Sequence, residues 1–256
     1  MRDLESGLRA RRDAGGRAFV PYVTGGLPGV DAGLLRELEE AGADAIEVGI
    51  PFSDPVMDGG VIQEASGAAL RAGARPAEVL AVVAKAALGI PVATMTYFNP
   101  VLRRGVEAFV AAAAGAGISG VIVPDLPVDE ATDLVGVCRS YGVAPVLLAA
   151  PGSSPERLRE VAASAGGFVY CVATYGVTGE RTALAATAEG VVAAMRPLTD
   201  LPLLVGVGIG TPEHAGEACR FADGVIVGSA LVRHLLAGDR PAALELARAF
   251  RAAIPA

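Results

Sequence analysis

Short runs of apolar and β-branched residues recur along the whole chain, separated by longer segments whose apolar positions follow helical spacing. The short runs are typical of buried strands and the longer segments of amphipathic helices. We expect strands at residues 18–24, 45–48, 92–96, 120–123, 144–149, 168–172, 203–206 and 224–227. We expect helices at residues 34–41, 76–87, 106–114, 155–165 and 187–195.

The alternation of strand and helix predicts consecutive right-handed βαβ units. About eight strands is the number that a closed parallel barrel needs, so we predict an α/β fold, a single (β/α)8 TIM barrel domain over residues 1–256. An open doubly wound sheet is the alternative. Its first strand is usually followed by a Gly-x-Gly-x-x-Gly turn, whereas the first strand here ends in Thr24-Gly25-Gly26-Leu27.

Helix punctuation agrees with this pattern. Proline stands where a first helical turn begins at Pro76, Pro155 and Pro212, and glycine follows helical segments, as a C-cap would, at Gly42, Gly89 and Gly142. We also expect an extra N-terminal helix and extended loops after the second and sixth strands. The loop after the second strand holds an amphipathic segment at residues 61–70, which is typical of a functional lid.

Composition excludes several classes of protein. The 256 residues are 52% hydrophobic, and the 21 Lys and Arg against 28 Asp and Glu give a net charge of -7 without any basic stripe, so a nucleic-acid partner is not expected. No signal-peptide core and no apolar run of ~18 residues is found, which predicts a cytoplasmic protein without a membrane span. Cys138, Cys171 and Cys219 are far apart, so we expect buried thiols rather than disulfides or zinc ligands.

Glu47 is a carboxylate inside the apolar run at residues 45–50, near the C-terminal end of the second predicted strand. Barrel strands are covered on both sides, so Glu47 should be buried. Desolvation should then raise its pKa toward neutrality, which suits proton transfer. The alternative is a structural glutamate paired with an arginine of a surrounding helix. Asp58 follows in the next loop, where Asp-Gly is by itself a common turn signal.

Three glycine-rich turns follow the last predicted strands, at residues 176–179, 206–210 and 228–230. Adjacent strands bring these turns to one part of the barrel rim. Glycine lets backbone amides approach an anion closely, and Gly228-Ser229 opens a short helix whose N-terminus favours negative charge. The sequence therefore predicts a phosphate site there.

Some chemistries are disfavoured by the residues present. Lys85 is the one lysine of the chain and falls in a helical segment, far from any strand's C-terminal end, which argues against a Schiff-base aldolase. His214 and His234 fall in late helical segments without Asp, Glu or Cys at ligand spacing, so a metal-dependent enzyme is not expected. The chemistry that remains as a candidate is acid-base catalysis by carboxylates on a phosphorylated small molecule.

Six motifs occur in order along the chain: Phe19-Val20-Pro21-Tyr22-Val23-Thr24, Glu47-Val48-Gly49-Ile50-Pro51-Phe52-Ser53-Asp54-Pro55, Asp58-Gly59, Met95-Thr96-Tyr97-Phe98-Asn99-Pro100, Pro124-Asp125-Leu126-Pro127 and Gly176-Val177-Thr178-Gly179. In these motifs, and over nearly its whole length, the chain resembles the tryptophan synthase alpha subunit family. The resemblance implies retro-aldol cleavage of indole-3-glycerol phosphate into indole and glyceraldehyde 3-phosphate, without cofactor or metal.

The resemblance also implies roles for individual residues. Glu47 matches the acid-base glutamate, which protonates indole C3 and takes the proton of the hydroxyl that becomes the aldehyde. Asp58 matches the aspartate that binds the indole N–H. The implied substrate-binding residues are the pocket aromatics Tyr22, Tyr97 and Tyr170, the mobile-loop threonine Thr178, and the phosphate-site residues Gly179, Gly206, Gly208, Gly228 and Ser229.

The chain departs from the family pattern at five positions. Leu27 replaces a usual aspartate, Gly60 a proline, Ala68 an arginine, Ala173 a serine and Val207 a phenylalanine. These changes bear on loop stiffness, on the indole and phosphate contacts, and on communication with a beta subunit. The family partner is the beta subunit, in an alpha2beta2 heterotetramer. Residues 53–55 belong to a loop that resembles the surface on which alpha subunits dock this partner. Three hypotheses stay open: an alpha subunit working with a beta subunit, a stand-alone lyase that releases free indole, and a weakly catalytic activator of a beta subunit.

Overall fold

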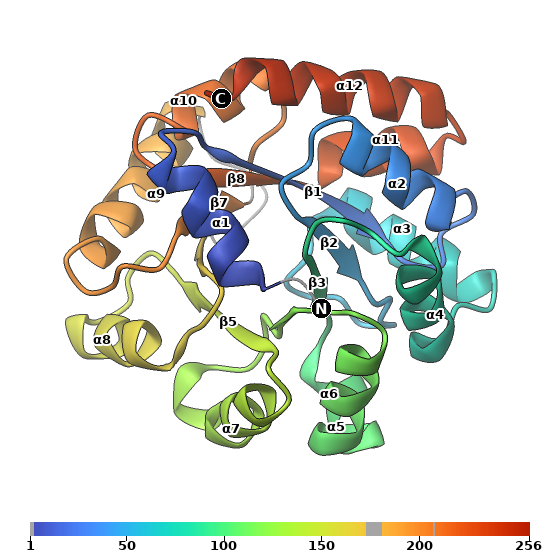
Figure 1. The fold of residues 1–256 in the computed structure, drawn as a ribbon, viewed down its shortest axis with the longest axis horizontal. Coiled ribbons are helices and arrows are strands. Elements are labelled where there is room, and N and C mark those ends of the chain that lie inside the picture. Colours follow the sequence, from blue (N-terminus) through green and yellow to red (C-terminus); the bar gives the residue numbers. More distant parts are fainter. Residues whose placement is uncertain (1–2, 173–180, 207) are drawn as a thin grey trace.

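The computed structural model describes residues 3–172, 181–206 and 208–256. Eight parallel strands close into a barrel in sequence order from β1 to β8, and Figure 1 shows helices arranged around them. The predicted TIM barrel is confirmed. The open doubly wound sheet is wrong, because β8 pairs with β1 and leaves no sheet edge.

All eight strands lie within one residue of the predicted bounds at each end. Each is buried on both faces and therefore reads as a short continuous apolar run. The strands are β1 (Ala18–Thr24), β2 (Ile46–Gly49), β3 (Val92–Met95), β4 (Gly120–Ile122), β5 (Ala144–Ala149), β6 (Val169–Val172), β7 (Leu203–Gly206) and β8 (Gly224–Val227).

The helices alternate with the strands, and the three predicted prolines each begin a helix, in α4, α8 and α10. The amphipathic segment predicted at residues 61–70 is the helix α3, and α9 begins at Arg181, earlier than predicted. The helices are α1 (Leu4–Asp13), α2 (Ala32–Glu40), α3 (Gly60–Arg71), α4 (Pro76–Ala86), α5 (Phe98–Arg104), α6 (Val106–Gly115), α7 (Thr132–Ser140), α8 (Pro155–Ser164), α9 (Arg181–Met195), α10 (Pro212–Ala218), α11 (Ser229–Leu236) and α12 (Arg240–Ala253).

Two of the three predicted glycine C-caps are confirmed. Gly42 and Gly142 follow α2 and α7 with φ of +96° and +66°, in the left-handed region that favours glycine. The prediction for Gly89 is wrong, because the C-cap of α4 is Ala87, with φ of +50°. The N–H of Gly89 donates to the Glu39 carboxylate at 2.8 Å, a long-range contact that no local pattern reveals.

The predicted N-terminal helix is α1, which packs across the N-terminal end of the barrel. Leu4 and Leu8 are buried, and a Cβ added to Gly120, the first residue of β4, would lie 2.5 Å from Leu4 Cδ2. The close approach explains why glycine begins this strand. The bottom of the barrel is therefore closed by apolar packing.

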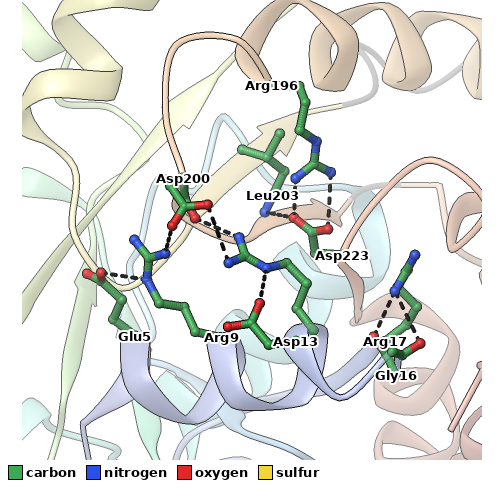
Figure 2. Close-up of polar contacts among 11 residues, drawn as sticks. Glu5, Arg9, Asp13, Gly16, Arg17, Arg196, Asp200, Leu203 and Asp223 are labelled. Carbon is green, nitrogen blue, oxygen red and sulfur yellow. Dashed lines mark hydrogen bonds and ion pairs between the residues drawn. The ribbon is translucent and has the colours of Figure 1, made fainter.

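Ion pairs lie at the same end of the barrel, as Figure 2 shows. Arg9 of α1 pairs with Asp200, in the loop before β7. Arg196 donates to both oxygens of the buried Asp223 carboxylate at 2.6 and 3.1 Å, and the Leu203 N–H donates to the same carboxylate at 2.8 Å. In TIM barrels this face serves stability, so the chemistry is sought at the opposite, C-terminal ends of the strands.

Two predictions from composition concern burial and membranes. Cys138, Cys171 and Cys219 are all free and buried, as predicted. Among the helices that the structure describes, none has the length and apolar character needed to cross a membrane. The cytoplasmic location stays a prediction.

Candidate active site

Glu47 is the second residue of β2 and is only 1% exposed. Its charge acts on Tyr22 of β1 and on Tyr170 of β6, so the carboxyl lies inside the barrel. Within the described part of the chain, Glu47 forms no ion pair and its Oε2 has no hydrogen-bond partner. The alternative of a structural glutamate paired with arginine is therefore wrong for the described residues.

Asp58 is held over the barrel mouth by contacts between the loop after β2 and Tyr97, the N-cap of α5. The Met57 N–H donates to the Tyr97 hydroxyl at 2.9 Å, and Tyr97 also hydrogen-bonds the Asp58 carboxylate. The ring of Phe52 stacks on Tyr97, with ring centroids 5.1 Å apart. Tyr97 thus anchors the loop and brings the Asp58 carboxylate close enough to raise the pKa of Glu47.

Burial gives the two carboxyl groups different pKa values. Desolvation, and secondly the charge of Asp58, raises the pKa of Glu47 from 4.5 to about 8. Desolvation also raises the pKa of Asp58, to about 6, against an opposing hydrogen bond from Tyr97. Near pH 7 Glu47 is therefore mostly protonated and Asp58 mostly ionised. Two carboxyl groups in these different states are suited to one proton donor and one charge stabiliser.

Two buried tyrosines reach across the barrel wall onto glycines that end neighbouring strands. A Cβ added to Gly49 would lie 2.1 Å from the Tyr22 Oη, and a Cβ added to Gly206 would lie 2.1 Å from the Tyr170 Oη. Burial raises the pKa of both phenols, so both stay protonated. Gly206, predicted to let an anion approach, is thus also needed to make room for Tyr170.

The phosphate-site candidates of the last two strands lie next to one another, because β7 pairs with β8. Gly206 ends β7, Gly228 caps α11 without a side-chain hydrogen bond, and the exposed Ser229 begins that helix. Gly208 has φ of +88°, which favours glycine. The N-terminus of α11 presents backbone N–H groups and the positive end of a helix dipole at this rim.

Six residues named from the sequence lie outside the described residues: Ala173, Gly176, Val177, Thr178, Gly179 and Val207. The other three departures from the family pattern lie within the described residues. Leu27 is buried in the hydrophobic core, Gly60 begins α3, and Ala68 packs half-buried on the same helix. A Cβ on Gly60 would meet nothing within 4 Å, so packing does not require glycine there.

Sequence reasoning missed the part of the site that depends on contacts between strands. Gly49 makes room for the Tyr22 hydroxyl, and Thr24 Oγ1 donates to that hydroxyl at 3.5 Å. The one local sign of this contact was the position of Gly49, two residues after the Glu47 carboxylate in the same strand. Thr96, directly after β3, also carries a buried hydroxyl without a partner among the described residues.

The residues used to argue against other chemistries lie where the sequence predicted. Lys85 is in the last turn of α4, His214 in α10 and His234 in α11. Across residues 3–172, 181–206 and 208–256, no group of three or more His, Cys, Asp or Glu side chains could hold a metal ion. The barrel mouth therefore offers carboxylates, phenols and backbone N–H groups to a ligand.

Known proteins are similar to this chain in sequence and in fold. The family described as tryptophan synthase alpha chain matches residues 8–251. The tryptophan synthase alpha chain of Streptomyces avermitilis is 45% identical, over 96% of this chain and 91% of its own length. A structure of Mycobacterium tuberculosis tryptophan synthase is 39% identical with a TM-score of 0.90, covering 99% and 98% of the two chains. The alpha subunit of Legionella pneumophila tryptophan synthase is 31% identical, also with a TM-score of 0.90, covering 99% and 98%. The chain therefore belongs to the tryptophan synthase alpha chain family.

Proposed function

We propose that this chain is a lyase that cleaves indole-3-glycerol phosphate into indole and glyceraldehyde 3-phosphate, with Glu47 and Asp58 as its catalytic residues. The observation that carries the proposal is the pair of carboxyl groups in the barrel mouth, one with a pKa of about 8 and the other of about 6. The direct test is steady-state release of indole by the purified chain. The whole chain is proposed to act as one catalytic domain.

The reaction breaks the bond between indole C3 and the first carbon of the glycerol chain. The protonated Glu47 delivers its proton to C3, and the carboxylate so formed takes the proton of the first-carbon hydroxyl as that carbon becomes the aldehyde. One proton leaves Glu47 and one returns, so the residue ends in its starting form. The Asp58 carboxylate accepts a hydrogen bond from the indole N–H and stabilises the positive charge that protonation places on the ring.

The two carboxyl groups predict a bell-shaped pH profile of kcat/KM. Activity should rise with pH through about 6, as Asp58 loses its proton, and fall through about 8, as Glu47 loses the proton it must deliver. Initial rates at low substrate concentration from pH 5 to 9.5 give both limbs, which belong to the coupled pair.

The variant Asp58→Asn provides the control for this profile. It should remove the acid limb, and it should move the alkaline limb to lower pH, because the charge of Asp58 is one of the two causes that raise the pKa of Glu47. A wild-type profile that stays flat from pH 7 to 9.5 would contradict the proton-donor role of Glu47.

We propose that the substrate phosphate binds at the turns after β6, β7 and β8, through Gly179, Gly206, Gly208, Gly228 and Ser229, with Thr178 from the same rim. The support is the N-terminus of α11, which begins directly after the Gly228 turn. Tyr22, Tyr97 and Tyr170 are proposed to line the indole and glycerol parts of the site. A phosphorylated substrate does not cross membranes unaided, so we place the reaction in the cytoplasm.

Gly228→Val should weaken binding of glycerol 3-phosphate about tenfold or more, because its methyl groups crowd the N–H groups that would donate to the anion. A Cβ at Gly228 would lie 3.5 Å from the nearest atom, a ring carbon of Tyr22, which is an ordinary van der Waals contact. Isothermal titration calorimetry measures the affinity. Gly136→Val, on the exposed face of α7, is the matched control. Unchanged affinity of the Gly228 variant would place the phosphate elsewhere.

We further propose that a tryptophan synthase beta subunit docks beside the barrel mouth, in an alpha2beta2 heterotetramer. A groove of about 500 Å³ lies between the loop after β2, the start of α4, and α5. Val56 and Leu102, on the loop and on α5, are 77% and 61% exposed. Exposed apolar residues with a polar rim are typical of protein interaction surfaces. Among the residues lining the groove are Phe52, Ser53, Leu70, Arg75 and Arg103.

A further inference from the structure

Tyr22 lies between the two ends of the proposed site. It is directly opposite Glu47 in the register of β1 and β2. On its other side its ring lies against Gly228, where an added Cβ would be 3.5 Å from Tyr22 Cδ1 and 3.7 Å from Cγ. Because β1 is the strand between β8 and β2, its tyrosine borders both the proposed phosphate turn and the proposed acid-base glutamate.

The Tyr22 hydroxyl is directed over β2, one step nearer the barrel mouth than Glu47. It occupies the place of a side chain at Gly49, since a Cβ there would lie 2.1 Å from Oη and 2.6 Å from Cζ. Side chains alternate along a strand, so positions 47 and 49 share one face of β2. The phenol therefore extends from the Gly228 turn to the edge of the carboxyl site.

Among the described residues, the Tyr22 hydroxyl is a donor without an acceptor. It accepts a hydrogen bond from Thr24 Oγ1 at 3.5 Å, and no described residue accepts one from it. Burial, and then the nearby carboxylates of Asp58 and Glu47, raise the pKa of the phenol, so it stays protonated. Buried donors in native structures are nearly always paired, so a bound ligand is the expected acceptor.

The proposed substrate carries an acceptor where this donor lies. Its three-carbon chain joins indole C3 to the phosphate; the first carbon bears the hydroxyl whose proton Glu47 takes, and the middle carbon bears a hydroxyl that the cleavage leaves untouched. With the phosphate at Gly228 and the first carbon at Glu47, the middle carbon must pass along Tyr22. We infer that the Tyr22 hydroxyl donates a hydrogen bond to this middle hydroxyl and makes Tyr22 a specificity-determining residue. The inference rests on the proposed function.

The test compares wild-type protein and Tyr22→Phe on two substrates: indole-3-glycerol phosphate and the analogue that lacks only the middle hydroxyl. Tyr22→Phe keeps the ring and its packing on Gly228. On the full substrate its kcat/KM should fall about 3- to 10-fold, the worth of one neutral hydrogen bond. On the analogue the two proteins should have equal kcat/KM, because the bond is absent from both.

Tyr141→Phe is the matched control, since Tyr141 is an exposed tyrosine on the outside of the barrel whose hydroxyl donates to Glu107. It should behave as wild type on both substrates. If Tyr22→Phe lowered kcat/KM equally on both substrates, Tyr22 would be a packing residue. If it lowered kcat/KM on neither, the proposed hydrogen bond would not exist. Either result overturns this inference and leaves the proposed function standing. Absence of cleavage by the wild-type protein itself would overturn the proposed function, and this inference with it.

Discussion

Glu47→Gln is expected to lower kcat for cleavage of indole-3-glycerol phosphate by about 10²-fold or more. Glutamine keeps the shape and the amide can still donate a hydrogen bond, but it cannot deliver a proton to indole C3 or take one from the first-carbon hydroxyl. Substrate affinity should persist, because phosphate and indole contacts come from other residues. Single-turnover rates and equilibrium binding to the purified variant separate the two quantities.

Stability provides the control for this variant. The folded protein keeps a proton on Glu47 up to about pH 8, whereas the unfolded chain releases it near pH 4.5. Between these values, rising pH favours unfolding of the wild type by up to ~1.4 kcal/mol for each pH unit, and glutamine does not titrate. The Tm of Glu47→Gln relative to wild type should therefore rise from pH 5 to 8. Near-wild-type kcat in a folded variant would remove Glu47 from the mechanism.

A beta subunit is expected to raise the turnover of this chain about 5- to 150-fold, the range of ordinary allosteric coupling. The loop after β2 carries both Asp58 and the exposed Ser53 and Asp54, which we propose contact the beta subunit. A partner that binds the closed loop more tightly than the open one shifts the population toward the state in which Asp58 is in place. Gly60, where the family has proline, should leave the unbound loop more open.

The measurement is steady-state cleavage by the purified chain, titrated with the beta subunit from the same source. Gly60→Pro is the informative variant: its isolated turnover should be higher than wild type and its activation by the partner smaller, because the loop is already restrained. Rapid turnover by the isolated chain without any response to the partner would favour the stand-alone lyase. Negligible turnover by both the isolated and the partnered chain, with activation of the beta reaction, would favour the non-catalytic activator.

Local sequence determined most of the fold. Strands buried on both faces appear in the sequence as short apolar runs, so every strand lies within one residue of its predicted bounds. Helices were recognised by the spacing of their apolar residues, and Pro76, Pro155 and Pro212 marked the first turns of three of them. These features depend on neighbours a few positions apart. Glu47 was also visible locally, because a carboxylate within an apolar strand is costly unless it has a function.

Tertiary structure decided what depends on residues distant in sequence. No local pattern shows that Gly49 is needed for the Tyr22 hydroxyl, that Tyr97 holds Asp58 in place, or that Ala87 rather than Gly89 is the C-cap of α4. The pKa values of the two carboxyl groups likewise follow from their burial and mutual approach inside a closed barrel. The sequence by itself determined the barrel and identified Glu47 and Asp58 as its candidate carboxylates. Their protonation states and their neighbours were decided only by the closure of the eight strands, because desolvation and close packing arise when distant segments meet.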